Sequence, residues 1–168
     1  MHIILGGKFT IMIKINIVCV GKVKESYYKE AISEYTKRLS RFASVKIIEV
    51  KEENFTDNVN ESEIQTIIKK EGENILKEVK GKAILMDING VEYSSKNFSN
   101  FVSKFIDKGD EMTFIIGGSY GVSEQVKISA DEKISFSKMT FPHTLFRVML
   151  VEQIYRAFMI RENSKYHK

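Results

Sequence analysis

The stretch Phe136-Ser-Lys-Met-Thr-Phe-Pro-His143 leads directly into a long amphipathic run over residues 144–161. Upstream of it lies a glycine cluster, Ile115-Ile-Gly-Gly-Ser-Tyr-Gly121, which follows an apolar run. A strand that opens into glycines lets a ligand approach the backbone closely. Phe136 and Phe141 belong to a second loop that can cover the same ligand. The C-terminal third is therefore predicted to hold the functional site.

The rest of the chain alternates between apolar runs and segments of helical periodicity. Strands are predicted over residues 13–20, 45–50, 83–88, 112–116 and 133–136, the third closed by Asn89-Gly90. Helices are predicted from Ser26, from a Ser62-Glu-Ile-Gln65 capping box, from Ser95 and over residues 144–161. This alternation predicts an α/β fold, with a mostly parallel sheet of five to six strands and helices on both faces.

Length and composition indicate one domain. The chain has 168 residues, enough for a sizeable core, and no stretch rich in Pro, Gly or Ser divides it. We expect a single domain over residues 12–168, because Met12 makes a natural start for the first strand. Residues 1–11 are interpreted as an N-terminal extension. Residues 51–60 are polar and are expected to form a mobile loop.

Cysteine usage and hydropathy exclude several classes of protein. Cys19 is the one cysteine, and the chain has no CxxC motif or Cys/His cluster, so we expect a buried thiol and no metal site. No apolar segment reaches membrane-spanning length, because Lys14 and Asn16 interrupt the first one. Residues 1–11 lack a small-residue cleavage site, and a cytoplasmic location is expected.

Positive charge is concentrated at the C-terminal end. The formal net charge is +4, and residues 138–168 contain six basic and two acidic residues, so this segment carries the whole excess. A basic tail beside a candidate ligand site predicts an anionic partner, with RNA the leading candidate. The alternative is a solvated helix face that happens to be basic.

The last predicted helix is apolar on more than one side. Its main apolar face comprises Leu145, Val148, Met149, Tyr155, Phe158 and Met159. Leu150, Val151 and Ile154 spread apolar character around the remainder, which predicts burial on more than one side. Because the sheet of a small chain covers one side, we expect a second subunit, in a homodimer, to cover the other. The alternative is that Val151 and Ile154 only touch the polar loop.

The glycine cluster does not match the common nucleotide-binding motifs. The dinucleotide fingerprint GxGxxG follows the first strand, whereas here that strand ends at Val20-Gly21-Lys22, with one glycine. GxxxxGK[ST] is also absent, and a flavodoxin-like phosphate loop has only a poor candidate in Lys22-Val-Lys24. Tight-turn glycines explain GGxxG alone equally well, but the carboxyl end of a parallel strand is where ligands bind in open α/β sheets.

Two pairs of polar residues share faces of the last helix. His143 and Arg147 are four residues apart, as are Glu152 and Arg156. A simple ion pair explains Glu152 and Arg156 best. His143 is either a helix-start residue or a catalytic group.

Taken together, these residues resemble the RlmH family of the SPOUT (α/β-knot) methyltransferases. The matching pieces are Ile116-Gly-Gly-Ser-Tyr-Gly121, Phe136-Ser-Lys-Met-Thr-Phe-Pro-His143, Arg147, Val151-Glu-Gln-Ile-Tyr-Arg-Ala157, Tyr166-His167-Lys168, Ile17-Val-Cys-Val-Gly-Lys22 and Tyr35-x-x-Arg38-Leu39. They cover essentially residues 12–168, and only the extension before Met12 departs from the family pattern.

The resemblance implies a homodimer with a deep C-terminal trefoil knot, although knots are otherwise very rare. It implies an S-adenosylmethionine-dependent enzyme that methylates N3 of a pseudouridine in the large-subunit (23S) ribosomal RNA, acting on the assembled ribosome. The alternative function is a non-catalytic ribosome- or RNA-binding module that uses the same basic tail.

Carried onto this sequence, the resemblance places the cofactor at three segments. These are Met86, the glycines Gly117, Gly118 and Gly121, and the loop Phe136, Ser137, Lys138, Met139, Thr140 and Phe141. Removal of the N3 proton calls for a base or a cation. The candidates for proton handling are Tyr166, His167 and His143, and those for binding phosphate or developing negative charge are Arg147, Arg156 and Lys168. Tyr166 and His167 match the family's terminal motif and are expected to handle the substrate.

Overall fold

Five parallel strands form the central sheet in the order β4-β3-β6-β5-β7 of a computed structural model that describes residues 2–5, 8–53 and 59–166. All four neighbouring pairs are parallel. The strands are β3 (Ile13–Val20), β4 (Ala43–Val50), β5 (Lys82–Glu92), β6 (Met112–Ile116) and β7 (Glu132–Ser135). The predicted parallel sheet is thereby confirmed, with five strands.

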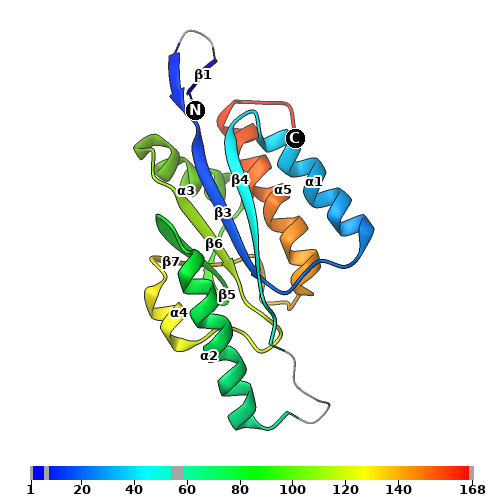
Figure 1. The fold of residues 1–168 in the computed structure, drawn as a ribbon. Helices are drawn as coiled ribbons and strands as arrows, with labels where there is room; N and C mark the ends of the chain where they lie inside the picture. Colours follow the sequence, from blue (N-terminus) through cyan, green and yellow to red (C-terminus); the bar gives the residue numbers. More distant parts are fainter. Residues whose placement is uncertain (1, 6–7, 54–58, 167–168) are drawn as a thin grey trace.

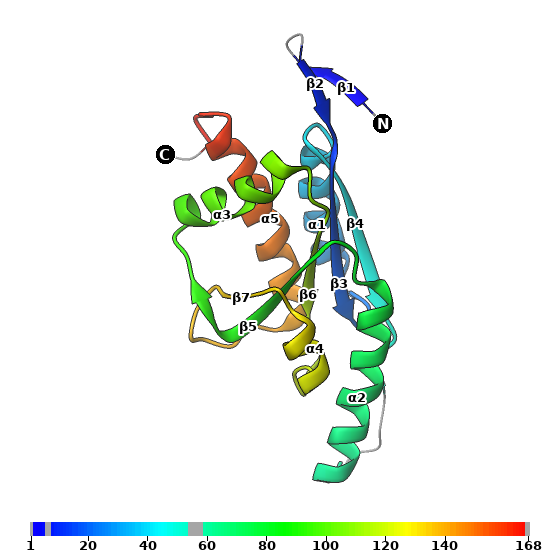
Figure 2. The same ribbon diagram turned by 90° about the vertical axis from the view of Figure 1, so that its left-hand side faces the viewer.

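Helices cover both faces of this sheet, as predicted (Figures 1 and 2). One face carries α1 (Ser26–Leu39), α3 (Ser95–Lys108) and α5 (His143–Arg161). The other carries α2 (Glu61–Glu78) and the short α4 (Glu124–Ser129), which the sequence analysis missed. Alternation along β3 serves both layers, since Ile15 and Ile17 face α5 while Val18 and Val20 face α2. Cys19 lies buried with the first group, as predicted.

Residues before the sheet form a separate two-stranded antiparallel hairpin, β1 (His2–Leu5) and β2 (Lys8–Ile11). It projects beyond the end of the sheet in Figure 1. The interpretation of residues 1–11 as an extension to a domain over 12–168 stays a prediction, as does the trefoil knot. Residues 54–58 of the expected mobile loop lie outside the described residues.

The third strand runs further than the sequence predicted. Asn89-Gly90 does not close it, because β5 continues to Glu92 and shifts register against β7 between Met86 and Val91. A Cβ at Gly90 would lie 2.5 Å from the backbone nitrogen of Ile134, so the glycine lets two backbones pass closely. Asn89-Gly90 therefore lies at a register shift within β5 and does not end the strand.

Helix boundaries differ slightly from the predicted ones. The capping box of α2 is formed by Asn60 and Glu63, two residues upstream of the predicted pair Ser62 and Gln65. Ser94, not Ser95, caps α3, and Gly109 ends that helix in the left-handed conformation with φ 72°. The side chain of Ser26 makes no capping bond, and α1 simply begins there.

Helix α5 is buried more deeply than one sheet face would allow, because α1 and α3 pack along its two flanks. Val151 and Ile154 are fully buried in the core, so they do not merely touch a polar loop. Neighbours within one subunit already cover them, and they no longer argue for a second subunit. Half-buried Val148, Met149 and Tyr155 remain at the surface of α5, and the homodimer stays a prediction.

No helix within the described ranges is both long and apolar enough to cross a membrane.

Candidate functional site

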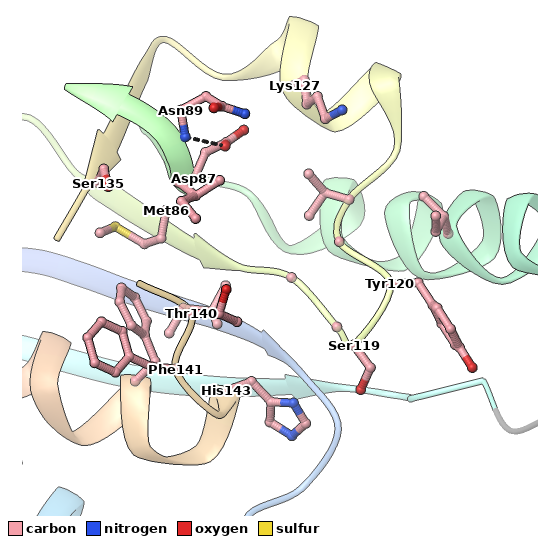
Figure 3. A pocket seen from close by; sticks show the side chains of 18 of the residues that line it. Met86, Asp87, Asn89, Ser119, Tyr120, Lys127, Ser135, Thr140, Phe141 and His143 are labelled. Atoms are coloured by element: carbon pink, nitrogen blue, oxygen red, sulfur yellow. Dashed lines mark hydrogen bonds between the residues drawn. The ribbon is translucent and has the colours of Figure 1, made fainter. Parts of the chain in front are cut away.

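A cavity of about 590 Å³ opens at the carboxyl edge of the sheet, where residues 86–89 of β5 and the segments after β6 and β7 meet the first turn of α5 (Figure 3). The strands are parallel, so their carboxyl ends lie at one edge, and the connections that leave them share the cavity wall. Its volume lies within the usual range for a pocket that holds a small molecule.

The structure brings the predicted cofactor residues together, with one exception. The cavity is lined by Met86, Gly117, Gly118, Gly121, Phe136, Ser137, Met139, Thr140 and Phe141. In Figure 3 the loop bearing Thr140 and Phe141 lies across the cavity from Met86. Lys138 is the exception, because its ammonium donates to the carbonyl oxygen of Ile88 at 3.1 Å and lies 3.6 Å from a carboxylate oxygen of Glu92.

The glycine loop is shaped by close contacts of its own backbone. A Cβ at Gly117 would lie 2.6 Å from Cγ1 of Val122 and 2.9 Å from the carbonyl oxygen of Gly121. The backbone nitrogen of Gly121 donates to the carbonyl oxygen of Gly118 at 3.0 Å, and Gly121 has φ +88°. Side chains are therefore excluded where the loop folds on itself, which leaves bare backbone facing the cavity.

A buried carboxyl group supports the glycine loop from behind. Glu71 of α2 is 3% exposed, and its Oε2 lies 2.8 Å from where a Cβ of Gly118 would stand. Oε1 accepts a hydrogen bond from the backbone nitrogen of Glu53 at 3.1 Å, whereas Oε2 has no partner among the described residues. Burial raises the pKa of Glu71, and the nearby carboxylates of Glu52 and Glu53 add to the shift.

The loop after β7 carries the aromatic wall of the cavity. The ring of Phe136 lies 5.1 Å from that of Phe146 and 6.0 Å from that of Phe98, so it is held between α5 and α3. The hydroxyl of Ser137 accepts from the backbone nitrogen of Met139 at 3.0 Å and turns the loop back toward the cavity. Met139 itself is 72% exposed, at the rim.

The head of α5 places His143 and Arg147 in different environments. His143 lines the cavity as the first residue of the helix. Arg147, one turn on, is fully buried behind it, and its guanidinium donates to the carbonyl oxygens of Val20 and Gly21 and to Glu49 at 3.1 Å. These contacts tie the end of β3 to α5. Burial argues against the predicted contact of Arg147 with a substrate phosphate and supports a positioning role.

The C-terminal tail lies along α5, away from the cavity of its own chain. The Tyr166 hydroxyl donates to Oε1 of Glu152 at 3.2 Å, and its ring packs on Tyr155 and under Arg156. Glu152 lies nine residues, or about 14 Å of helix axis, beyond His143. Burial and the nearby Glu152 raise the pKa of Tyr166, which disfavours this phenol as a base. His167 and Lys168 lie outside the described residues.

The predicted ion pair between Glu152 and Arg156 is present, at 2.6 Å. Arg156 is thereby held by a carboxylate within its own chain.

Sequence reasoning missed several polar residues of the cavity. Asp87 and Asn89, at the irregularity within β5, lie on the opposite side of the cavity from His143 (Figure 3). Oδ1 of Asp87 accepts a hydrogen bond from the backbone nitrogen of Asn89 at 2.9 Å. Lys127 of the missed helix α4 pairs with Glu124 at 2.6 Å, and this pairing raises the pKa of Lys127. The predicted third strand, residues 83–88, already contains Asp87, so its place in the sequence gave no separate signal for a cavity residue.

Within the part of the chain that the structure describes, no group of three or more His, Cys, Asp or Glu side chains is placed to hold a metal ion.

Known proteins resemble this chain over most of its length. Residues 13–167 match the model of a family described as predicted SPOUT methyltransferases. A Clostridium perfringens protein named ribosomal RNA large subunit methyltransferase H 1 is 50% identical over 157 residues, which are 92% of this chain and 99% of that protein. A Caldicellulosiruptor saccharolyticus protein named ribosomal RNA large subunit methyltransferase H is 47% identical, with the same two coverages.

Among solved structures, a probable methylase family protein from Haemophilus influenzae Rd KW20 superposes with a TM-score of 0.47 at 11% identity. The match covers 92% of this chain and 70% of that chain. A likeness this distant assigns no ligand or function.

The buried position of Arg147 predicts a large stability cost for its removal. Arg147→Met leaves Glu49 and two carbonyl oxygens without their buried donor, so we expect a loss of about 3–5 kcal/mol in the free energy of unfolding. The matched control is Arg156→Met, whose ion pair is partly exposed, with an expected loss of about 1 kcal/mol or less. Urea denaturation measures both, and equal losses would contradict the role given to Arg147.

The raised pKa of Glu71 predicts a pH-dependent stability. Folding favours the protonated form of Glu71. The stability that this form contributes is fully present below the ordinary pKa of 4.5 and is lost as the pH rises through the raised pKa of the folded protein. Glu71→Gln keeps the neutral form at every pH, so its stability relative to wild type should increase as the pH rises above the ordinary carboxyl pKa of 4.5. Glu73→Gln, on the exposed side of the same helix, is the control. Parallel pH profiles for wild type and Glu71→Gln would refute the assignment.

Proposed function

Because this chain belongs to the SPOUT methyltransferases, and within them to the RlmH family of ribosomal RNA large subunit methyltransferases, we propose that it methylates large-subunit ribosomal RNA. The proposed methyl donor is S-adenosylmethionine, and the proposed acceptor is N3 of a pseudouridine in 23S ribosomal RNA on the assembled ribosome. The observation that carries the proposal is the convergence of Met86, the glycine loop and the aromatic loop on one cavity at the carboxyl edge of the sheet.

The lining of the cavity fits this donor. An adenosine group needs apolar walls and backbone hydrogen-bonding groups, which Met86, Phe136, Phe141 and the bare backbone at Gly117 supply. The donor has no phosphates, so the absence of a P-loop from the sequence is consistent with it. The carboxylate of Asp87 offers an acceptor for ribose hydroxyls or for an ammonium group.

S-adenosylmethionine supplies a methyl group on a cationic sulfur that is open to in-line displacement. The protein must therefore mainly align donor and acceptor and exclude water between them. The aromatic loop is placed to do this, because Phe136 is held by Phe98 and Phe146 rather than free to move with ligand. Rigid walls of this kind favour a fixed approach of the acceptor nitrogen.

The N3 proton of the acceptor has to leave as the new bond to carbon forms. His143 is the candidate acceptor of that proton within the described chain, because it lines the cavity and an imidazole exchanges protons under physiological conditions. Arg147 acts through His143 and Gly21, by fixing the head of α5 against β3.

Tyr166 and His167 are proposed to handle the substrate across a homodimer. Tyr166 turns back along its own α5 only as far as Glu152, so it does not reach its own cavity. A second subunit packed on the half-buried strip Val148, Met149 and Tyr155 would bring its tail to this cavity instead.

Close packing at Gly117 predicts the effect of its replacement on cofactor affinity. Gly117→Ala forces the loop away from Val122, so we expect at least about tenfold weaker binding of S-adenosylmethionine in calorimetry. Gly109→Ala is the control: with φ +72° and open space around its Cβ, it should cost about 1–2 kcal/mol of stability and no affinity. Absence of saturable binding to wild type at millimolar cofactor would overturn the proposed donor.

The modified nucleotide is identified by mass spectrometry of ribosomal RNA from cells with and without the gene. The proposal predicts loss of one methyl group from a pseudouridine of the large-subunit RNA, restored by wild-type protein and not by Gly117→Ala. A non-catalytic RNA-binding module would leave every methyl group in place and would bind ribosomes independently of cofactor.

A further inference from the structure

A groove on the sheet face that carries α5 is lined by lysines that do not belong to the cavity. It lies between α1 and the edge strand β4, with the loop after β3 at one end. Its lining includes Lys22, Lys29 and Lys37, all exposed, and none of the three forms an ion pair with a described residue. The carboxylate of Glu49 also lines it but is already held by Arg147.

The basic tail predicted from the sequence is largely neutralised in the folded protein. Arg147 pairs with Glu49, Arg156 with Glu152, and Arg161 with Asp107 at 2.7 Å. The cations that gave residues 138–168 their excess charge are thus mostly engaged within the chain. The three groove lysines, in contrast, keep their charge available to a partner.

The groove begins where the cavity ends. Lys22 follows Gly21, whose carbonyl oxygen accepts from Arg147 at 3.0 Å, and Arg147 is one turn from the cavity residue His143. Figure 1 shows the loop from β3 to α1 passing beside the first turns of α5. Lys29 and Lys37 lie eight residues, or about 12 Å, apart along α1, so they can contact different phosphates of one strand.

We propose that the α1–β4 groove, with Lys22, Lys29 and Lys37, docks the RNA strand that flanks the nucleotide held in the cavity. The lysines bind the phosphates of that strand. This inference rests on the proposed function for the identity of the RNA, but it concerns a surface outside the cofactor cavity.

The test compares two triple variants of equal charge. Lys22→Gln/Lys29→Gln/Lys37→Gln removes the groove lysines, whereas Lys69→Gln/Lys70→Gln/Lys77→Gln removes three exposed lysines of α2, on the other face of the sheet. Binding to purified ribosomes that lack the methyl group is measured over a series of potassium chloride concentrations. The groove variant should lower the slope of log affinity against log salt by about 2, because each single-strand phosphate contact contributes about 0.7. The α2 variant should leave the slope unchanged.

Calorimetry with S-adenosylmethionine should show unchanged cofactor affinity for both triple variants. Equal ribosome binding by the two triple variants would overturn the groove assignment.

Failure of the proposed function gives a different result. Wild type that binds ribosomes through the groove but transfers no methyl group from labelled S-adenosylmethionine would support the groove proposal and contradict the proposed enzyme activity. Wild type that methylates ribosomes, together with a groove variant that binds ribosomes as the α2 variant does, would support the enzyme activity and contradict the groove proposal. Wild type that neither binds nor methylates ribosomes would contradict both.

Discussion

Parallel pairing of β5, β6 and β7 is the constraint on which the candidate site depends. It forces the three chain segments that leave these strands to start from one edge of the sheet, although Met86 and Phe141 lie far apart in sequence. Two local conditions let these segments form a cavity rather than a solid plug. Gly117 and its neighbours keep side chains out of one wall, and Phe98 and Phe146 hold Phe136 against the other.

The sequence predicts most of this arrangement. It does not predict the features that depend on contacts between residues far apart in the chain. Buried runs between clear turns gave β3 and β6 with their observed ends, and the glycine cluster predicted a ligand site. Helix α4 has six residues, too few to show a helical period. Asp87 is an ordinary polar residue until the fold places it in the cavity. The burial of Arg147 depends on carbonyl oxygens more than a hundred residues away, which no local pattern reveals.

Charge illustrates the same limit. Counted along the chain, the excess positive charge belongs to the last thirty residues, but in the folded protein carboxylates of other elements engage Arg147 and Arg161. The net charge of a segment counts all its ionised side chains, whereas a binding partner interacts with the charges that remain unpaired at the surface of the folded protein. On this view the buried Arg147 has two effects, because it fixes the head of α5 and pairs with Glu49, a carboxylate that also lines the groove with the lysines.

A crystal structure of the protein with S-adenosylmethionine tests the central claim most directly. The claim is that the three segments at the carboxyl edge of the sheet form one binding site. We predict electron density for the ligand between Met86, the backbone at Gly117 and the loop over residues 136–141, with the methyl group directed toward His143. Ligand bound elsewhere on the protein, with this cavity closed by its own side chains, would contradict the account.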